Sequence, residues 1–107
     1  MIIEVKLEDL KVEIIPEENL IMEKYKQFRK SPIKKKALEF LPQKVKTITI
    51  NLEKVERVDH CFISDLIWLK KKFDPKDTEI VLTNIKSDYV KEFLKAVKVE
   101  DILNIRF

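Results

Sequence analysis

The chain has 107 residues, with 22 basic and 19 acidic side chains, and its formal net charge is +3. This length suits one domain with one hydrophobic core, so residues 1–107 are expected to form a single domain. The sequence contains no glycine. This absence excludes the P-loop, the glycine-rich dinucleotide-binding turn and the G-x-S-x-G nucleophile elbow, because each needs glycine for positive φ or close backbone approach.

Composition also indicates where the protein works. With 45% hydrophobic and 38% charged residues the chain has a soluble globular composition. The apolar runs are short, so neither a membrane span nor a secretory leader is expected, and a lone cysteine fits a reducing cytoplasm. Abundant Lys, Glu and Ile suggest a bacterial thermophile, although an AT-rich genome biases composition in a similar direction.

The first half of the chain predicts two strands and then two helical segments. Ile3, Val5 and Leu7 alternate with charged residues, and the run from Leu10 to Ile15 also alternates, so a hairpin-like pair is expected. Pro16-Glu17-Glu18 suits the first turn of a helix with one apolar face, formed by Leu20, Ile21, Tyr25 and Phe28. Ser31-Pro32 breaks or re-caps this helix, and a second amphipathic segment, with Ile33, Ala37, Leu38 and Leu41, continues to Pro42.

The second half predicts strands that alternate with helices. Strands are expected at 45–52, 79–83 and 104–107, and helices at 62–72 and 88–97, the latter capped by Ser87. Such alternation implies right-handed crossovers between parallel strands. The expected fold class is therefore α/β, a mixed β-sheet with largely parallel inner strands and helices packed against it.

The connection from the strand at 45–52 to the following helix is the predicted functional region. A helix N-terminus at this point gathers unpaired backbone N–H groups and the positive end of the helix dipole. In α/β folds of this kind, ligands and partners meet the protein at the carboxyl ends of the strands.

The residues of this connection resemble a known family. Residues 50–63, INLEKVERVDHCFI, are similar to the signature of the STAS domains, which include the bacterial anti-sigma factor antagonists and related sulphate-transporter domains. In that family a strand ending in Asp-Leu-Ser is followed by a hydrophobic residue and then by Asp-Ser-Ser-Gly-Leu-Gly at a helix start. The likeness continues through residues 78–82, 84–94 and 97–103, so it is good over roughly residues 45–107. The residues before 45 are only compatible with the family pattern.

The sequence also departs from the family pattern. The family phosphorylates the second Ser of its motif, and the two Ser positions here are His60 and Cys61. Phe62 and Ser64 replace the two glycines, and Asn51 replaces the first acidic residue of the family strand. The resemblance therefore implies the fold and a protein-binding role, whereas the usual phospho-acceptor is missing, and Cys61 occupies its position.

The predicted function is that of a non-catalytic regulatory module which binds a protein partner through residues 56–61 and the helix after them. The predicted partner-binding residues are Asp59, His60, Cys61, Phe62, Ser64 and Asp65. The resemblance implies that the partner is a serine kinase of the anti-sigma type, a signalling scaffold or a transporter subunit. No catalytic residue, metal, cofactor, nucleic acid or membrane insertion is expected.

Alternatives remain open from the sequence alone. Asp59 can serve as a helix cap, as a determinant of recognition, or as both. Cys61 with His60 could make a small redox-responsive or enzymatic protein, although a buried small hydrophobe is the more common role of a lone cysteine. Ser64 is a candidate displaced phospho-acceptor, and Trp68 is either a core residue or an exposed anchor.

The basic residues at 29–30, 34–36 and 70–72 permit a nucleic-acid binder, but interspersed acidic residues favour a solvated face.

Overall fold

The computed structural model describes residues 3–8, 11–28, 31–39, 45–73, 78–103, 105 and 107. Four strands and five helices lie within these residues. Their order is β1 (Ile3–Glu8), β2 (Lys11–Pro16), α1 (Met22–Phe28), α2 (Pro32–Leu38), β3 (Thr47–Asn51), α3 (His60–Phe73), β4 (Glu79–Thr83), α4 (Asp88–Val97) and α5 (Val99–Leu103).

The four strands form one mixed sheet in the order β1-β2-β3-β4. The hairpin partner β1 is antiparallel to β2, whereas β2, β3 and β4 are parallel to one another. Ile14, Ile50 and Leu82 lie opposite each other across the three parallel strands, and all three are buried. The predicted α/β fold with largely parallel inner strands is confirmed.

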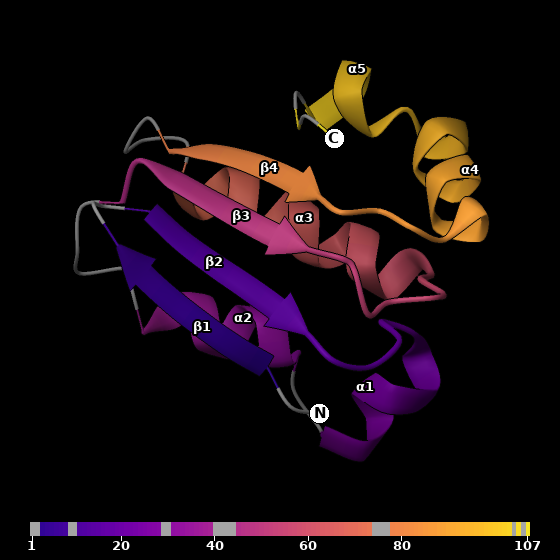
Figure 1. Ribbon diagram of the computed structural model, residues 1–107, viewed down its shortest axis with the longest axis horizontal. Helices are drawn as coiled ribbons and strands as arrows, with labels where there is room; N and C mark the ends of the chain where they lie inside the picture. Colours follow the sequence, from indigo (N-terminus) through magenta and orange to yellow (C-terminus); the bar gives the residue numbers. More distant parts are fainter. Residues whose placement is uncertain are drawn as a thin grey trace.

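Helices α2 and α3 pack behind the sheet in Figure 1, while α1 lies at the carboxyl end of β2, and α4 and α5 lie beyond β4. The strands bury alternate side chains toward the core, and α3 buries apolar residues one turn apart, as a helix on a sheet must. These helix residues are Phe62, Leu66, Leu69 and Phe73. Each contributes about 1.5–3 kcal/mol relative to an exposed position, so α3 is firmly seated.

The prediction that a helix begins at Pro16 is wrong. Pro16 is the last residue of β2, and α1 begins only at Met22. Between them Leu20, which is fully buried, pairs with the segment before α3: its N–H donates to the carbonyl of Arg57 at 3.1 Å, and its carbonyl accepts the N–H of Asp59 at 3.2 Å. Long-range backbone pairing and burial of Leu20 thus outweigh the local helix-start signal of Pro16 and the two glutamates.

The other elements follow their predictions with shifted ends. Helix α3 starts at His60 instead of residue 62, and β3 spans a shorter range than 45–52. Ser31 caps α2, with its hydroxyl accepting the Lys34 N–H at 3.2 Å, and α2 ends at Leu38, while the predicted continuation over residues 40–42 lies outside the described residues. β4 and α4 have the predicted bounds, and Ser87 caps α4.

The prediction of a strand at 104–107 is wrong for the two residues of this range that the structure describes. Ile105 and Phe107 belong to no strand, and residues 104 and 106 lie outside the described residues. The short helix α5 precedes this segment instead, and the Ile105 side chain is fully buried in the core. An apolar residue near the chain end is therefore used for packing and not for extending the sheet.

Candidate functional site

The loop before α3 is shaped by Asp59. Its Oδ1 accepts the backbone N–H of Cys61 at 2.9 Å, and its carbonyl accepts the N–H of Phe62 at 3.1 Å. A carboxylate at this position satisfies a first-turn N–H group and opposes the positive end of the helix dipole. Asp59 is therefore the cap of α3, as one of the sequence alternatives expected.

The same carboxylate holds a second helix. Asp59 Oδ2 accepts the backbone N–H of Met22, the first residue of α1, at 2.8 Å. Nearby, the Asn19 side-chain carbonyl accepts the N–H groups of Glu56 and Arg57 at 2.9 and 3.0 Å. These contacts attach the loop to the segment before α1, so side-chain acceptors define a loop that has no glycine.

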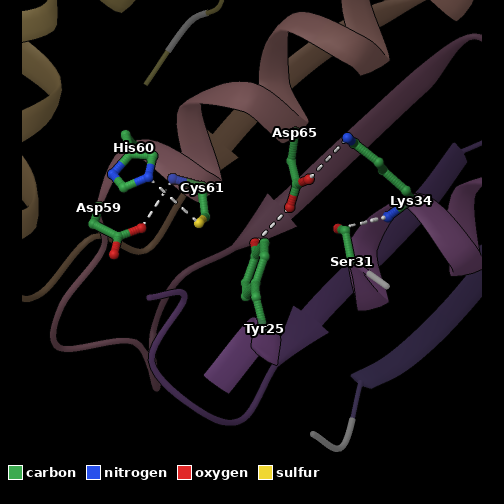
Figure 2. Close-up of polar contacts among 7 residues, drawn as sticks. All are labelled: Tyr25, Ser31, Lys34, Asp59, His60, Cys61 and Asp65. Carbon is green, nitrogen blue, oxygen red and sulfur yellow. Dashed lines mark hydrogen bonds and ion pairs between the residues drawn. The ribbon is translucent and has the colours of Figure 1, made fainter. Parts of the chain in front are cut away.

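The predicted partner-binding residues divide into two groups. His60 and Ser64 are exposed and Asp59 and Cys61 are partly exposed, whereas Phe62 is fully buried and Asp65 is only 1% exposed. The Sγ of Cys61 lies 3.9 Å from Nε2 of His60, so these neighbouring side chains point toward each other (Figure 2). Only the exposed and partly exposed residues can contact a partner directly. Phe62 and Asp65 can contribute only through the packing of α3.

The environment of Cys61 does not favour a reactive thiolate. Partial burial raises the pKa of the Cys61 thiol, and the carboxylates of Asp59 and Asp65 raise this pKa further, against a smaller opposing effect of Lys34. Reactive cysteines have depressed pKa values in electropositive surroundings. The redox or enzymatic alternative therefore gains no support from this position.

Asp65 joins three helices at a buried polar cluster. Its Oδ2 accepts the hydroxyl hydrogen of Tyr25, from α1, at 2.5 Å, and its Oδ1 lies 4.0 Å from Nζ of Lys34, from α2 (Figure 2). Burial raises the pKa of Asp65, although Tyr25, Ser31 and Lys34 act in the opposite direction. Burial and the neighbouring carboxylate also raise the pKa of Tyr25. Asp65 is thus a structural member of the site that ties α1 and α2 to α3.

Sequence reasoning missed one apolar residue on the surface of α3. Ile67 is 38% exposed, whereas Trp68 is partly buried and packs against the core. His60, Ser64, Ile67 and Lys71, which are all exposed, recur at helical spacing, and we call them the outer face of α3. The spacing of these residues was the available signal for Ile67.

The described residues hold no group of three or more His, Cys, Asp or Glu side chains placed to bind a metal ion, and none of their helices is long and apolar enough to cross a membrane. Among the basic residues, Lys34 lies near Asp65 and Lys36 lies 3.8 Å from Glu39, while residues 29 and 30 are outside the described part.

The fold and site together define a class of α/β protein: a mixed sheet with helices on one face and a capped helix start after its central parallel strand. The chain belongs to the STAS domain family, whose model matches residues 17–106. The match begins well before the region from residue 45 in which the motif resemblance is good. Comparison with curated proteins gave no match.

Two solved structures share this fold. A candidate anti-sigma factor antagonist from Thermotoga maritima is 21% identical, with a TM-score of 0.74 over 98% of this chain and 86% of that one. The anti-sigma factor antagonist SpoIIAA in its unphosphorylated form is 16% identical, with a TM-score of 0.62 over 94% of this chain and 100% of that one.

Proposed function

We propose that this chain is a regulatory protein-binding domain that docks its partner through the loop before α3 and the outer face of α3. The observation that carries the proposal is the exposure of His60, Ser64 and Ile67 along one side of a helix whose start is held by Asp59. An apolar side chain surrounded by polar ones agrees with the apolar centre and polar rim of protein interfaces. Membership of the STAS family and the likeness to one anti-sigma factor antagonist and one candidate antagonist support this role.

The roles of the site residues follow from their positions. His60, Cys61 and Ser64 would touch the partner, Asp59 would hold the loop in shape, and Phe62 and Asp65 would seat α3 from inside. The family resemblance makes a serine kinase of the anti-sigma type, a signalling scaffold or a transporter subunit the proposed partner. No catalytic step is needed for this role.

Regulation would differ from the usual switch of the family. Cys61 stands where the family carries its phosphorylated serine, and a thiol with a raised pKa is neither that acceptor nor a strong nucleophile. The domain would then bind its partner constitutively, or be controlled by modification elsewhere, with Ser64 as the nearest exposed hydroxyl on α3.

The test is quantitative affinity capture from the native cell, with isotope-labelled comparison of wild type and Ile67→Arg. Leu38→Arg is the matched control, because Leu38 is also an exposed aliphatic residue, 50% against 38% exposed, but belongs to α2. A partner that is lost with Ile67→Arg and retained with Leu38→Arg supports the proposal. Equal retention by both folded variants would exclude the outer face of α3 as the docking surface.

A further inference from the structure

The loop before α3, residues 52–59, is anchored from inside by apolar side chains. It contains neither glycine nor proline and lies between the segment before α1 and the start of α4 (Figure 1). Every third residue, Leu52, Val55 and Val58, is at most 2% exposed, and the residues between them are exposed. The loop therefore has a buried row and an outward row of side chains. The outward row consists of Glu53, Lys54, Glu56 and Arg57.

One side chain holds the backbone of two adjacent outward residues. Oδ1 of Asn19 accepts the N–H of Glu56 at 2.9 Å and the N–H of Arg57 at 3.0 Å, 37 and 38 positions away in the sequence. The next residue, Leu20, adds backbone bonds to Arg57 and Asp59 at 3.1 and 3.2 Å. Asn19 thus fixes the place from which the Glu56 and Arg57 side chains extend.

The other side of the loop is held by α4. Ser87, the N-cap of α4, donates its hydroxyl hydrogen to the carbonyl of Glu56 at 2.7 Å. The guanidinium carbon of Arg57 lies 5.5 Å from the ring centroid of Tyr89, in the first turn of the same helix. The N–H and the carbonyl of Glu56 are therefore both occupied, by Asn19 and by Ser87. A loop held in this way has little conformational entropy left to lose when a partner binds.

The outward side chains differ in whether they are already paired. Glu53 and Lys54 form ion pairs with residues of other segments, at 3.0 and 3.4 Å. Within the described part of the chain, neither Glu56 nor Arg57 forms an ion pair. The two unpaired charges of the row thus belong to the two residues whose backbone Asn19 holds.

We propose that Asn19 is a positioning residue of the docking surface: it holds Glu56 and Arg57 where the partner contacts them, so that the partner binds a preformed loop. Asn19 acts through the loop, and its own contact with the partner is not required. When only a fraction of a protein has the binding-competent conformation, its apparent affinity falls by that fraction, and loss of the Asn19 acceptor should lower this fraction. This inference rests on the proposed function and adds how the loop is kept ready for its partner.

The experiment compares three variants of the full chain. Asn19→Ala removes the acceptor, and Asn19→Asp keeps an acceptor oxygen at the same position. Thr78→Val is the matched control, because it removes another long-range bond from a side chain to a backbone group, the 2.6 Å bond to the Val45 carbonyl. Thr78 directly precedes β4, so this bond lies at the opposite end of the parallel strands from the loop. Asn19→Gln, which displaces the amide by one methylene group, replaces Asn19→Ala should that variant not fold.

The first measurement is amide hydrogen exchange of the free chain labelled with ¹⁵N. Asn19→Ala should speed exchange of the Glu56 and Arg57 amides by about fivefold or more, because their acceptor is lost and the loop opens locally. Asn19→Asp should restore slow exchange, and Thr78→Val should leave these two amides within about twofold of wild type. Unchanged exchange in Asn19→Ala, or equal acceleration in Thr78→Val, would overturn the proposal.

The second measurement is calorimetric titration with the purified partner that wild type captures from the native cell. Asn19→Ala should weaken binding by about fivefold or more, whereas Asn19→Asp and Thr78→Val should stay within about twofold of wild type. In a chain that also carries Glu56→Ala and Arg57→Ala, Asn19→Ala should have less than about a twofold effect, because the side chains it positions are gone. A loss of the same size in that background would mean that Asn19 does not act through these two residues.

The two proposals can fail separately. A partner that is lost with Ile67→Arg but bound normally by Asn19→Ala would leave the outer face of α3 as the docking surface and refute the role of Asn19. A partner that is weakened by Asn19→Ala, restored by Asn19→Asp and insensitive to Ile67→Arg would support Asn19 and refute the outer face of α3.

Discussion

The Asp59 carboxylate accepts the backbone N–H of Met22 at 2.8 Å, 37 positions away in the sequence. Its other oxygen caps α3 through Cys61, so one side chain satisfies the starts of two helices. This finding makes Asp59 structural as well as a member of the candidate docking loop.

Asp59→Ala should lower the free energy of unfolding by about 1–3 kcal/mol, because each lost cap contributes about 0.5–2 kcal/mol. Asp59→Asn should cost less, since its single carbonyl oxygen can keep one of the two caps. Urea denaturation of both variants measures this. Glu56→Ala, an exposed side chain in the same loop, is the control. An Asp59→Ala protein as stable as the control would show that neither cap matters.

Cys61 should react slowly with thiol reagents near neutral pH. Burial and the nearby carboxylates raise its pKa, so the thiolate fraction is smaller than for an ordinary cysteine, whose pKa is about 8.5. The rate of alkylation by iodoacetamide as a function of pH checks this, with the urea-unfolded chain as reference. Faster reaction in the folded state, with an apparent pKa below the reference, would revive the redox alternative.

Asp65 should make the protein less stable as pH rises. Its folded-state pKa is raised above the unfolded value, so the native state binds the proton more tightly. The stabilisation is complete below the unfolded pKa, near 3.9, and is lost as pH rises through the folded pKa. Asp65→Asn should flatten this part of the pH profile and match or exceed wild type at pH 7. Chemical denaturation from pH 4 to 7 measures it.

Tyr25→Phe separates the hydrogen bond from the charge. It leaves a buried carboxylate without its Tyr25 donor, which should cost about 1–3 kcal/mol at pH 7. In the Asp65→Asn background the same change should cost less. Equal costs in the two backgrounds would mean that the Asp65 charge has no part in the interaction.

Lys98→Gly should stabilise the chain. Lys98 ends α4 in the left-handed conformation, with φ at 59°, where a side chain with a Cβ is strained and glycine is usual. The expected gain is about 1 kcal/mol, measured by thermal denaturation. Asn84→Gly is the comparison, because Asn84 has φ at 54° and asparagine tolerates this region better, so its gain should be smaller. A loss of stability with Lys98→Gly would contradict the strain argument.

Replacing Cys61 by Ser tests whether the phosphorylation switch of the family is missing from this chain. Once a kinase partner has been identified by capture, Cys61→Ser should be phosphorylated by it and wild type should not, because the thiol is not a phosphoserine acceptor. Mass spectrometry of both proteins locates the label. Stoichiometric labelling of wild type, for example at Ser64, would show that the acceptor has moved and has not been lost.

Elements with strong local signals were predictable from the sequence. The alternation of residues 79–83 and the apolar spacing after Ser87 are set by neighbours within one or two turns, and β4 and α4 have the predicted bounds. The capping role of Asp59 in α3 is equally local, since its bond to Cys61 spans two residues. The family likeness was readable for the same reason, because its motif is a continuous strand, loop and helix start.

Tertiary structure decided what depends on distant pairs. Pro16 and two glutamates favour a helix start, yet pairing of Leu20 with Arg57 and Asp59 keeps that segment extended. Tyr25 meets Asp65 across 40 positions, and Arg57 lies over Tyr89 from another element. No local periodicity encodes these contacts, because they arise only when the parallel sheet brings the carboxyl ends of its strands together and places α1, α3 and α4 around them.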